Sequence, residues 1–372
     1  MLLPVSLAAQ SVVVQVRNPS NFARHGEVVS VKAEDVRALA PSIDLARAVV
    51  FDANQNKRAL SQLADNEFLF MVDCEAGGSS VYVIRNGGEG VAAPPSVVDG
   101  RHVIPRGDYA WENDRIAFRV YGSPLAGDVW NGIDVWAKRV RSLVVAKWYR
   151  ESEGSPPGKD TYHVDRGEGA DFFSVGRSLG AGGSGLWVDG KVCQPGAFSS
   201  WKTIANGPLR VCFELSYDSI MVEETIYREV RRISLDAGQN LSSITVTYFG
   251  ADSGRPYEAA LGLVTRSGVR PATDDRACWL SLWGPTTPDT TTESLGTAVL
   301  VPPAVFAGFA QDNAHHLLIA RGSMWVPLTY YAGAGWTRSG DFASEDDWMS
   351  YLSLFAARLR EPLGVALARG QN

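Results

Sequence analysis

The chain has 372 residues, of which 45% are hydrophobic and 20% are charged, as in an ordinary globular protein with a sizeable core. Its formal net charge is -6. A general nucleic-acid binder would instead carry a basic stripe, so we expect no nucleic acid as a partner. The 11 tryptophans are many for this length, and their flat faces suit stacking against a sugar or a base.

The first residues form an apolar run that ends in Ala8, Ala9 and Gln10. A small-residue ending is typical of a signal-peptide cleavage site, so we interpret residues 1–10 as a signal-peptide remnant rather than as a first strand. We therefore expect a periplasmic or extracellular protein. No other segment approaches the ~20 apolar residues of a membrane span, so we expect no membrane partner.

Apolar and polar residues alternate along much of the remaining chain. In residues 115–122, the side chains of Ile116 and Val120 face one way and those of Arg119 and Tyr121 face the other. Turn-forming residues separate such segments, with 37 Gly and 19 Pro in the chain. This pattern predicts half-buried antiparallel strands, and it recurs at residues 141–149, 209–217, 242–249, 277–284 and 315–322.

A stretch rich in Gly and Pro, residues 87–107, predicts a linker. We therefore expect residues 11–107 to form a small N-terminal β-unit with its linker. Residues 108–372 are expected to form a large β-region, although the two could be one continuous domain. A region of this size is too large for a simple sandwich, so large two-sheet sandwiches and barrels are the candidates.

Helix signals are few. Residues 33–40 predict a short helix of two turns, and residues 344–360 predict a longer one. In the longer segment Ser344 is an N-cap candidate, and Trp348 and Phe355 belong to an apolar stripe that repeats every three to four residues. We expect this stripe to pack on the sheets.

Two polar clusters precede the middle of the chain. Asp114 and Arg115 follow a turn and would either line a sheet face or cap an edge. Lys147, Trp148 and Tyr149 are placed near the end of a predicted strand, where Lys147 and Tyr149 would share a face. A cation beside aromatic rings suits an anionic sugar, whereas the alternative is a lysine that protects an edge strand from aggregation.

The densest polar cluster is TYHVDRGEGADFF, residues 161–173. If this segment is extended, His163 and Asp165 lie on one face, and a carboxylate beside an imidazole orients the ring. Gly167 and Gly169 flank Glu168 and allow the backbone to turn sharply there. The alternative interpretation is a solvated loop.

Three chemistries could use this cluster. A uronate lyase needs a base such as His163 or Tyr162, and a cation such as Arg166 or Lys147 to neutralise the substrate carboxylate. A glycosidase needs two carboxylates, for which Asp165, Glu168 and Asp171 are candidates. A mutarotase or epimerase needs one acid and one base across the sugar ring.

The sequence gives no certain cofactor. A metal site built from His163, Asp165 and Glu168 rests on a weak signal, and Ca²⁺ is the ion to consider. The four cysteines form no CxxC pair, which argues against a thiolate metal site. Nucleophile-elbow, Walker, HExxH and dinucleotide-binding motifs do not occur in a suitable context.

Four long motifs resemble a bacterial domain-of-unknown-function family, numbered four-eight-six-one. They are WENDRIAFRVYG, YHVDRGEGADFFSVGRSLGAGGSGLW, NGPLRVCFELSY and YYAGAGWTRSGDFASEDDW. The likeness runs from about VRNPSNFARHGEVVSV to the final helix. It implies an exported protein that accompanies the degradation of pectin and other polyuronates. It also implies an all-β fold, a large antiparallel sandwich similar to the galactose-mutarotase-like supersandwich, with a small N-terminal β-unit and a C-terminal helix. Fold alone does not fix function.

We therefore expect an enzyme acting on an acidic oligo- or polysaccharide that contains uronate, most readily a polysaccharide lyase. The alternatives are a glycoside hydrolase, a mutarotase or epimerase, and a non-catalytic sugar-binding protein. Candidate catalytic residues are Tyr162, His163, Asp165, Arg166 and Glu168, and candidate substrate-binding residues are Asp114, Arg115, Lys147, Trp148, Tyr149 and Trp336.

Overall fold

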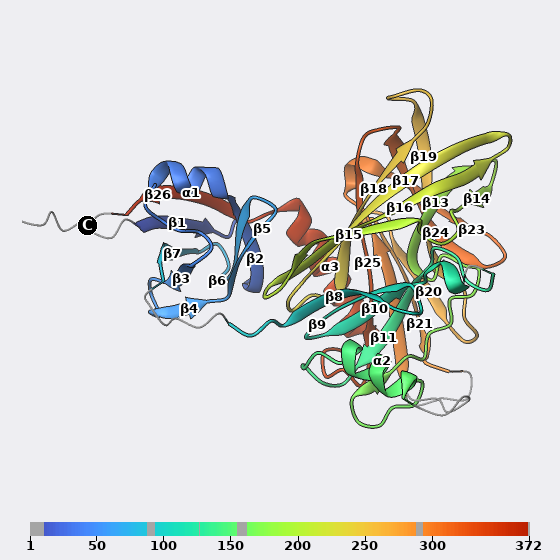
Figure 1. Cartoon of the computed structure of the whole chain (residues 1–372), viewed down its shortest axis with the longest axis horizontal. Helices are drawn as coiled ribbons and strands as arrows, with labels where there is room; N and C mark the ends of the chain where they lie inside the picture. Colours follow the sequence, from blue (N-terminus) through green and yellow to red (C-terminus); the bar gives the residue numbers. More distant parts are fainter. Residues whose placement is uncertain (1–10, 88–93, 126, 155–161, 288–292, 371–372) are drawn as a thin grey trace, which may run out of the picture. The chain divides into compact units, whose positions relative to one another are not determined.

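The computed structural model describes residues 11–87, 94–125, 127–154, 162–287 and 293–370, so the proposed signal-peptide remnant and Thr161 lie outside it. The chain divides into two compact units (Figure 1). The first contains the chain up to Val97, together with Gly207–Arg210 and the segment from Arg360 onward. The second contains Val98–Asn206 and Val211–Leu359.

The first unit is built from two antiparallel sheets and a short helix. Its five-stranded sheet has the order β26 (Gly364–Arg369), β1 (Ser11–Arg17), β7 (Ser79–Asn86), β3 (Ala48–Asp52) and β4 (Lys57–Ala59). Its three-stranded sheet has the order β2 (Arg24–Lys32), β6 (Glu67–Cys74) and β5 (Ser61–Ala64), and helix α1 spans Ala33–Leu39.

The core of this unit follows from strand alternation. Val12, Val14 and Val16 of β1 are fully buried, while the side chains between them are not. They share a core cluster with Ile84 of the neighbouring strand β7 and with Phe70 of β6, which belongs to the other sheet. The last strand, β26, pairs antiparallel with β1 along its whole length, from Val12 opposite Arg369 to Arg17 opposite Gly364. The C-terminal segment therefore completes the first unit.

The second unit contains three antiparallel sheets. The first has the order β12 (Gly169–Ala170), β11 (Ile133–Lys138), β10 (Ile116–Val120), β9 (Asp108–Asn113) and β8 (Val98–Val103). The second has the order β14 (Lys191–Cys193), β13 (Ala181–Val188), β19 (Pro256–Val264), β24 (His315–Ser323) and β23 (Phe306–Gln311). The eight-stranded sheet has the order β15 (Ser200–Asn206), β16 (Arg210–Val222), β17 (Thr225–Asp236), β18 (Leu241–Phe249), β25 (Leu328–Trp336), β22 (Ser294–Leu300), β21 (Trp279–Pro285) and β20 (Arg270–Asp274). The expected β-sandwich class is confirmed.

Helix α3, Glu345–Arg360, confirms the helix predicted near the C-terminus. Its fully buried Trp348 donates a hydrogen bond from Nε1 to Ser281 Oγ at 2.9 Å. Gly296 makes this approach feasible, because a Cβ there would lie 2.6 Å from Trp348 Nε1 and 2.7 Å from the ring of Trp283. Two short 3₁₀ turns, Ser123–Leu125 and Pro303–Val305, complete the regular structure.

The strand predicted over residues 141–149 is wrong, because Val145–Glu153 form helix α2. A helix advances about 100° per residue, so adjacent Trp148 and Tyr149 can both face the sheet, while Lys147 points to solvent. The shared face expected for Lys147 and Tyr149 therefore does not exist. Both aromatic rings pack on Trp136 of β11, with ring centroids 5.5 Å and 5.1 Å away.

Two further observations concern the cysteines and the helices. The cysteines at positions 74, 193, 212 and 278 are all free thiols. Among the described helices, none is long and apolar enough to cross a membrane.

Candidate functional site

A buried arginine organises the sheet that contains β9, β10 and β11. Arg119 on β10 is only 4% exposed, because helix α2 and the segment after residue 161 cover the face that the alternation assigns to polar side chains. Its Nη2 atom donates to Asp134 Oδ2 at 2.5 Å and to Asp171 Oδ2 at 2.9 Å. Asp108 Oδ2 lies 3.9 Å from Nη1. Three carboxyl groups thus surround one guanidinium.

Burial controls the protonation of these carboxyl groups. Removal from water raises the pKa of Asp171 well above its usual value, and neighbouring Asp134 raises it further. Burial likewise raises the pKa of Asp108, although Arg119 opposes the shift. Oδ1 of Asp171 is buried, and within the described part of the chain it has no hydrogen-bond partner. Asp171 therefore retains its proton at a higher pH than an exposed aspartate.

Tyr162 lies next to this arginine and is 5% exposed. Its hydroxyl oxygen accepts hydrogen bonds from Arg106 Nη1 at 2.9 Å and from Arg119 Nη1 at 3.4 Å. Its ring stacks on that of Trp136, with centroids 4.8 Å apart. In this arrangement Tyr162 is held between two guanidinium groups and is covered from solvent.

His163 is the accessible member of the cluster. Its side chain is 46% exposed, and its ring centroid is 4.7 Å from that of Tyr162. Nδ1 lies 3.0 Å from the backbone oxygen of Asp171 and 3.6 Å from Oδ2 of the same residue. The imidazole is therefore held through Nδ1 by Asp171, whose carboxyl group is almost fully buried. The neighbour of His163 is Asp171, and not Asp165 as an extended segment would require.

Asp165 instead closes a tight turn. Its Oδ1 accepts hydrogen bonds from the amides of Gly167 and Gly169 at 2.8 and 3.0 Å, and Oδ2 accepts one from Arg139 at 2.9 Å. Partial burial opposes ionisation, but these donors together hold the pKa of Asp165 below its usual value. Gly169 is required there, because φ is +113° and a Cβ would lie 2.0 Å from the Ala137 oxygen.

Glu168 ties the same segment to helix α2. Both of its carboxylate oxygens lie 2.8 Å from Lys147 Nζ, and Oε2 accepts a hydrogen bond from Trp148 Nε1 at 3.2 Å. The bond from Lys147 lowers the pKa of Glu168, so this carboxyl group is ionised. Arg166, between Asp165 and Glu168 in the sequence, is exposed.

The aromatic residues proposed as stacking platforms are packing residues. Trp148, Tyr149 and Trp336 are 4%, 3% and 1% exposed, so none presents a ring face to solvent. Tyr149 donates its hydroxyl to Asp108 Oδ2 at 3.1 Å, and the ring of Trp336 lies 5.5 Å from that of Phe172. Their assignment to sugar stacking is therefore corrected.

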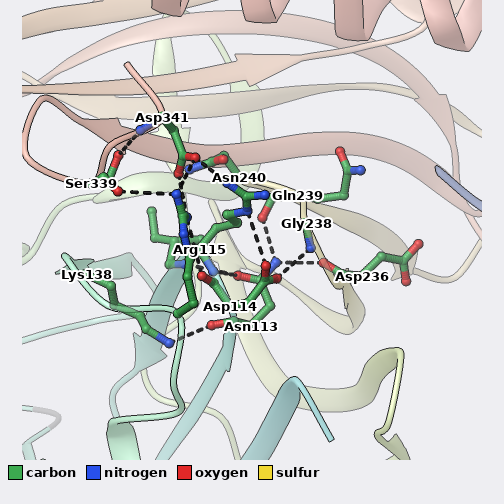
Figure 2. A network of polar contacts seen from close by, with 12 residues as sticks. Asn113, Asp114, Arg115, Lys138, Asp236, Gly238, Gln239, Asn240, Ser339 and Asp341 are labelled. Atoms are coloured by element: carbon green, nitrogen blue, oxygen red, sulfur yellow. Dashed lines mark hydrogen bonds and ion pairs between the residues drawn. The ribbon is translucent and has the colours of Figure 1, made fainter. Parts of the chain in front are cut away.

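Asp114 and Arg115 stabilise the turn between β9 and β10 (Figure 2). Asp114 Oδ1 accepts a hydrogen bond from the amide of Gly238 at 2.7 Å, and Arg115 forms an ion pair with Asp341. Asn113 Nδ2 donates to the backbone oxygens of Asp236 and Gln239, at 2.6 and 2.7 Å, so this turn is joined to the one that links β17 and β18. These contacts support a structural interpretation of both residues.

The potential metal ligands do not converge. Over the described ranges, no three His, Cys, Asp or Glu side chains gather in a way that could hold a metal ion. His163, Asp165 and Glu168 have separate partners, namely Asp171, Arg139 and Lys147. The weak metal signal in the sequence thus has no counterpart there.

Arg119, Asp134 and Arg106 belong to the cluster but were absent from the candidate residues. Alternation in residues 115–122 does place Arg119 and Tyr121 on one face. A half-buried sheet would leave that face in water, whereas every residue of β10 is buried. Arg119 is separated from its partners Asp134 and Asp171 by 15 and 52 residues in the sequence. No local pattern could therefore indicate the pairing.

The chain is similar to known proteins in sequence and in fold. The family described as "Domain of unknown function (DUF4861)" matches residues 16–365. "Uncharacterized protein P7" of Formosa agariphila is similar to the chain, with 32% identity over 278 residues, which is 70% of this chain and 67% of that protein.

Two solved structures from Enterococcus faecalis are also similar. A protein in Glycosyl Hydrolase Family 38 has a TM-score of 0.52 and 9% identity, and the match covers 98% of this chain and 47% of that one. An alpha-mannosidase has a TM-score of 0.47 and 9% identity, with coverage of 97% and 46%. The first likeness concerns the fold alone. The chain spans less than half the length of either structure.

Proposed function

The chain belongs to the family described as Domain of unknown function (DUF4861), and that description assigns no activity, so we propose a function from the geometry of the site. The protein is a carbohydrate-active enzyme, exported from the cell, that acts on oligo- or polysaccharides containing uronate. Its reaction is a β-elimination at the uronate residue.

One observation carries this proposal. His163 presents a half-exposed imidazole whose Nδ1 is engaged by Asp171, so Nε2 is the nitrogen left for a substrate. General acid–base chemistry needs an accessible base in a fixed orientation, and here a buried residue fixes that orientation. The solved structure in Glycosyl Hydrolase Family 38 supports only the fold on which such a site is built.

The proposed reaction uses His163 twice. Nε2 removes the proton from C5 of the uronate, the C–H electron pair becomes the C4–C5 double bond, and the C4–O bond breaks. The imidazolium then returns its proton to the departing oxygen, which leaves as a hydroxyl group. Arg166, an exposed cation of the same segment, is assigned to the substrate carboxylate. Tyr162 and Asp171 are both buried, so they are assigned to positioning the imidazole and not to contact with the substrate.

The hydrolase alternative is less well supported. A glycosidase needs one carboxylic acid whose pKa is raised so that it can protonate the leaving group. Asp165 instead has a lowered pKa, because the amides of Gly167 and Gly169 and the guanidinium of Arg139 outweigh its partial burial, and the bond from Lys147 lowers the pKa of Glu168. Asp171 does have a raised pKa, but its side chain is only 1% exposed, so it cannot reach a glycosidic oxygen. In the experiment below, mutarotase or epimerase activity, or binding without turnover, would produce neither a new double bond nor new reducing ends.

The test incubates the full chain with a panel of polyuronates and their oligosaccharides, with and without Ca²⁺. Ultraviolet absorbance follows the new double bond, and reducing ends are measured in parallel. We expect both signals to rise, and His163→Ala to lower the rate by about 10²–10⁴-fold, the range for loss of a general acid–base group.

The matched control is His25→Ala. The Nδ1 atom of His25 lies 3.8 Å from Asp73, but both side chains are exposed, by 64% and 58%. This substitution should leave turnover unchanged. Reducing ends without the double bond would show a hydrolase, and turnover that survives His163→Ala would contradict the assigned site.

A further inference from the structure

A cavity of about 380 Å³ lies in the second unit, between strands that do not contribute to the His163 cluster. Its lining comes from the end of β13, the β16–β17 hairpin, the start of β19 and the turn after β24. The volume is within the ~300–1,000 Å³ usual for small-molecule sites. In Figure 1, β19 and helix α2 lie at opposite ends of this unit. The cavity is therefore separate from the candidate active site.

The lining combines aromatic rings with charged groups. Trp187, Tyr227 and Tyr257 supply the rings, and Arg255 and Glu258 supply charges at the mouth. Arg255 and Glu258 are both exposed. A ligand with both C–H faces and hydroxyl groups would satisfy such a lining.

Two glycines seat the tyrosine rings. A Cβ at Gly322 would lie 2.3 Å from Cζ and 2.4 Å from the hydroxyl oxygen of Tyr257. A Cβ at Gly250 would lie 2.8 Å from Cε1 of Tyr227. The hydroxyl of Tyr257 is buried and has no hydrogen-bond partner among the residues that the structure describes. An unsatisfied buried hydroxyl is costly, so a polar ligand that reaches it would gain a hydrogen bond.

Trp325 directly follows Met324, which lines the cavity, and provides a rigid aromatic face. Its side chain is 46% exposed, although its backbone has φ of +69°, a conformation that is strained for a bulky residue. The indole is fixed by a hydrogen bond from Nε1 to the Gly250 oxygen at 3.0 Å, and by an edge-to-face contact with Phe249 at 4.9 Å. Strain that holds an aromatic ring toward solvent indicates a binding role, since a fixed ring loses little entropy on contact.

We propose that this cavity, with the Trp325 face at its side, is a binding site for an uncharged sugar ring of an oligosaccharide. Glu223 and Glu258 outnumber Arg255 in the lining, so a uronate ring would meet a net negative charge. The same charges oppose the seating of lipid chains, which would have to desolvate them. The inference does not rest on the function proposed for His163.

The test measures dissociation constants by calorimetry with the full chain. The probes are neutral gluco-, manno-, xylo- and galacto-oligosaccharides, compared with oligogalacturonates. We expect a neutral oligosaccharide to bind, and Trp325→Ala to weaken it by about tenfold or more, through loss of the stacking face. Trp201→Ala is the matched control, because Trp201 is 44% exposed and also lies on the surface of the second unit.

A second pair of variants tests the cavity itself. Tyr257→Phe removes only the hydroxyl and should weaken binding severalfold. Tyr217→Phe removes another buried hydroxyl that lacks a partner among the described residues, and should have no effect on binding. Circular dichroism verifies that each variant is folded.

The outcomes are distinct. Binding of acidic oligosaccharides alone, no binding by any member of the panel at millimolar concentration, or equal losses for Trp325→Ala and Trp201→Ala would each overturn the proposal. His163→Ala should leave this affinity unchanged, so failure here and failure of the proposed enzyme activity can be told apart.

Discussion

Nδ1 of His163 faces the backbone oxygen of Asp171 at 3.0 Å. A carbonyl oxygen can only accept a hydrogen bond, so Nδ1 must carry the proton and, in the neutral ring, Nε2 must carry the lone pair. The tautomer of His163 is thereby set by the backbone, and the nitrogen that can act as a base is Nε2.

This tautomer can be observed directly. We expect the ¹⁵N chemical shifts of neutral His163 to show a protonated Nδ1 and an unprotonated Nε2. His315 is an internal reference, because its Nε2 accepts a hydrogen bond from the Leu179 amide at 2.9 Å and must also be unprotonated. A protonated Nε2 on neutral His163 would contradict the proposed role as base.

The stability of the protein should depend on pH through Asp171. Burial raises its pKa in the folded state, so its contribution is fully present below the unfolded pKa of about 3.9 and is lost as pH rises through the folded pKa. Asp171→Asn should therefore gain stability relative to the natural chain as pH rises above about 4. Urea unfolding over a pH series measures this difference.

Asp165→Asn is the control of opposite sign. The pKa of Asp165 is lowered in the folded state, so its contribution is present above the unfolded pKa and disappears as pH falls through the folded pKa. The natural chain should lose stability relative to this variant below about pH 4. Parallel curves for the two variants would show that burial does not control Asp171.

Arg119 should be far more important for stability than an exposed arginine. Arg119→Met leaves Asp134 and Asp171 buried without their cation, and breaking a buried pair in this way costs about 3–5 kcal/mol. Arg101→Met removes an ion pair with Asp99 in which the arginine side chain is 43% exposed, and should cost at most about 1 kcal/mol. Unfolding in guanidinium chloride measures both, and equal costs would contradict the buried network.

Strand β26 should stabilise the first unit through one side chain. Leu367 packs against the core of that unit, so Leu367→Asp should lower the free energy of unfolding by about 1–3 kcal/mol. Ala366 on the same strand is exposed, and Ala366→Asp should change it by less than about 0.5 kcal/mol. Thermal unfolding followed by circular dichroism compares the two. Similar effects would indicate that β26 acts through backbone pairing alone.

Local pattern was sufficient for much of the fold. Alternation predicted strands such as Ile116–Val120 and Leu241–Phe249, and the three-to-four-residue repeat predicted helix α3. Helix α2 was mistaken for a strand, because nine residues with two adjacent aromatics satisfy either period. Tertiary packing on Trp136 decides between them.

The candidate site was only partly predictable. The polar stretch before Phe173 contains His163 and Asp171, and composition was enough to single it out. Arg119, the partner of Asp171, lies on β10 and was expected to face solvent, because a single sequence does not show which sheet faces are covered. The interpretation of Trp148 and Trp336 as sugar platforms failed for the same reason, since tryptophan excess does not distinguish core from surface.

The pairing of β26 with β1 constrains the order in which the chain can mature during synthesis. Strand β1 is made before the second unit, but the neighbour that completes its sheet is made only after that whole unit. At ~5–20 residues per second, that wait is on the order of tens of seconds. Throughout it, one edge of β1 has unpaired backbone groups available to other nascent chains. The second unit can finish folding first, so the amino-terminal unit is the later of the two to close.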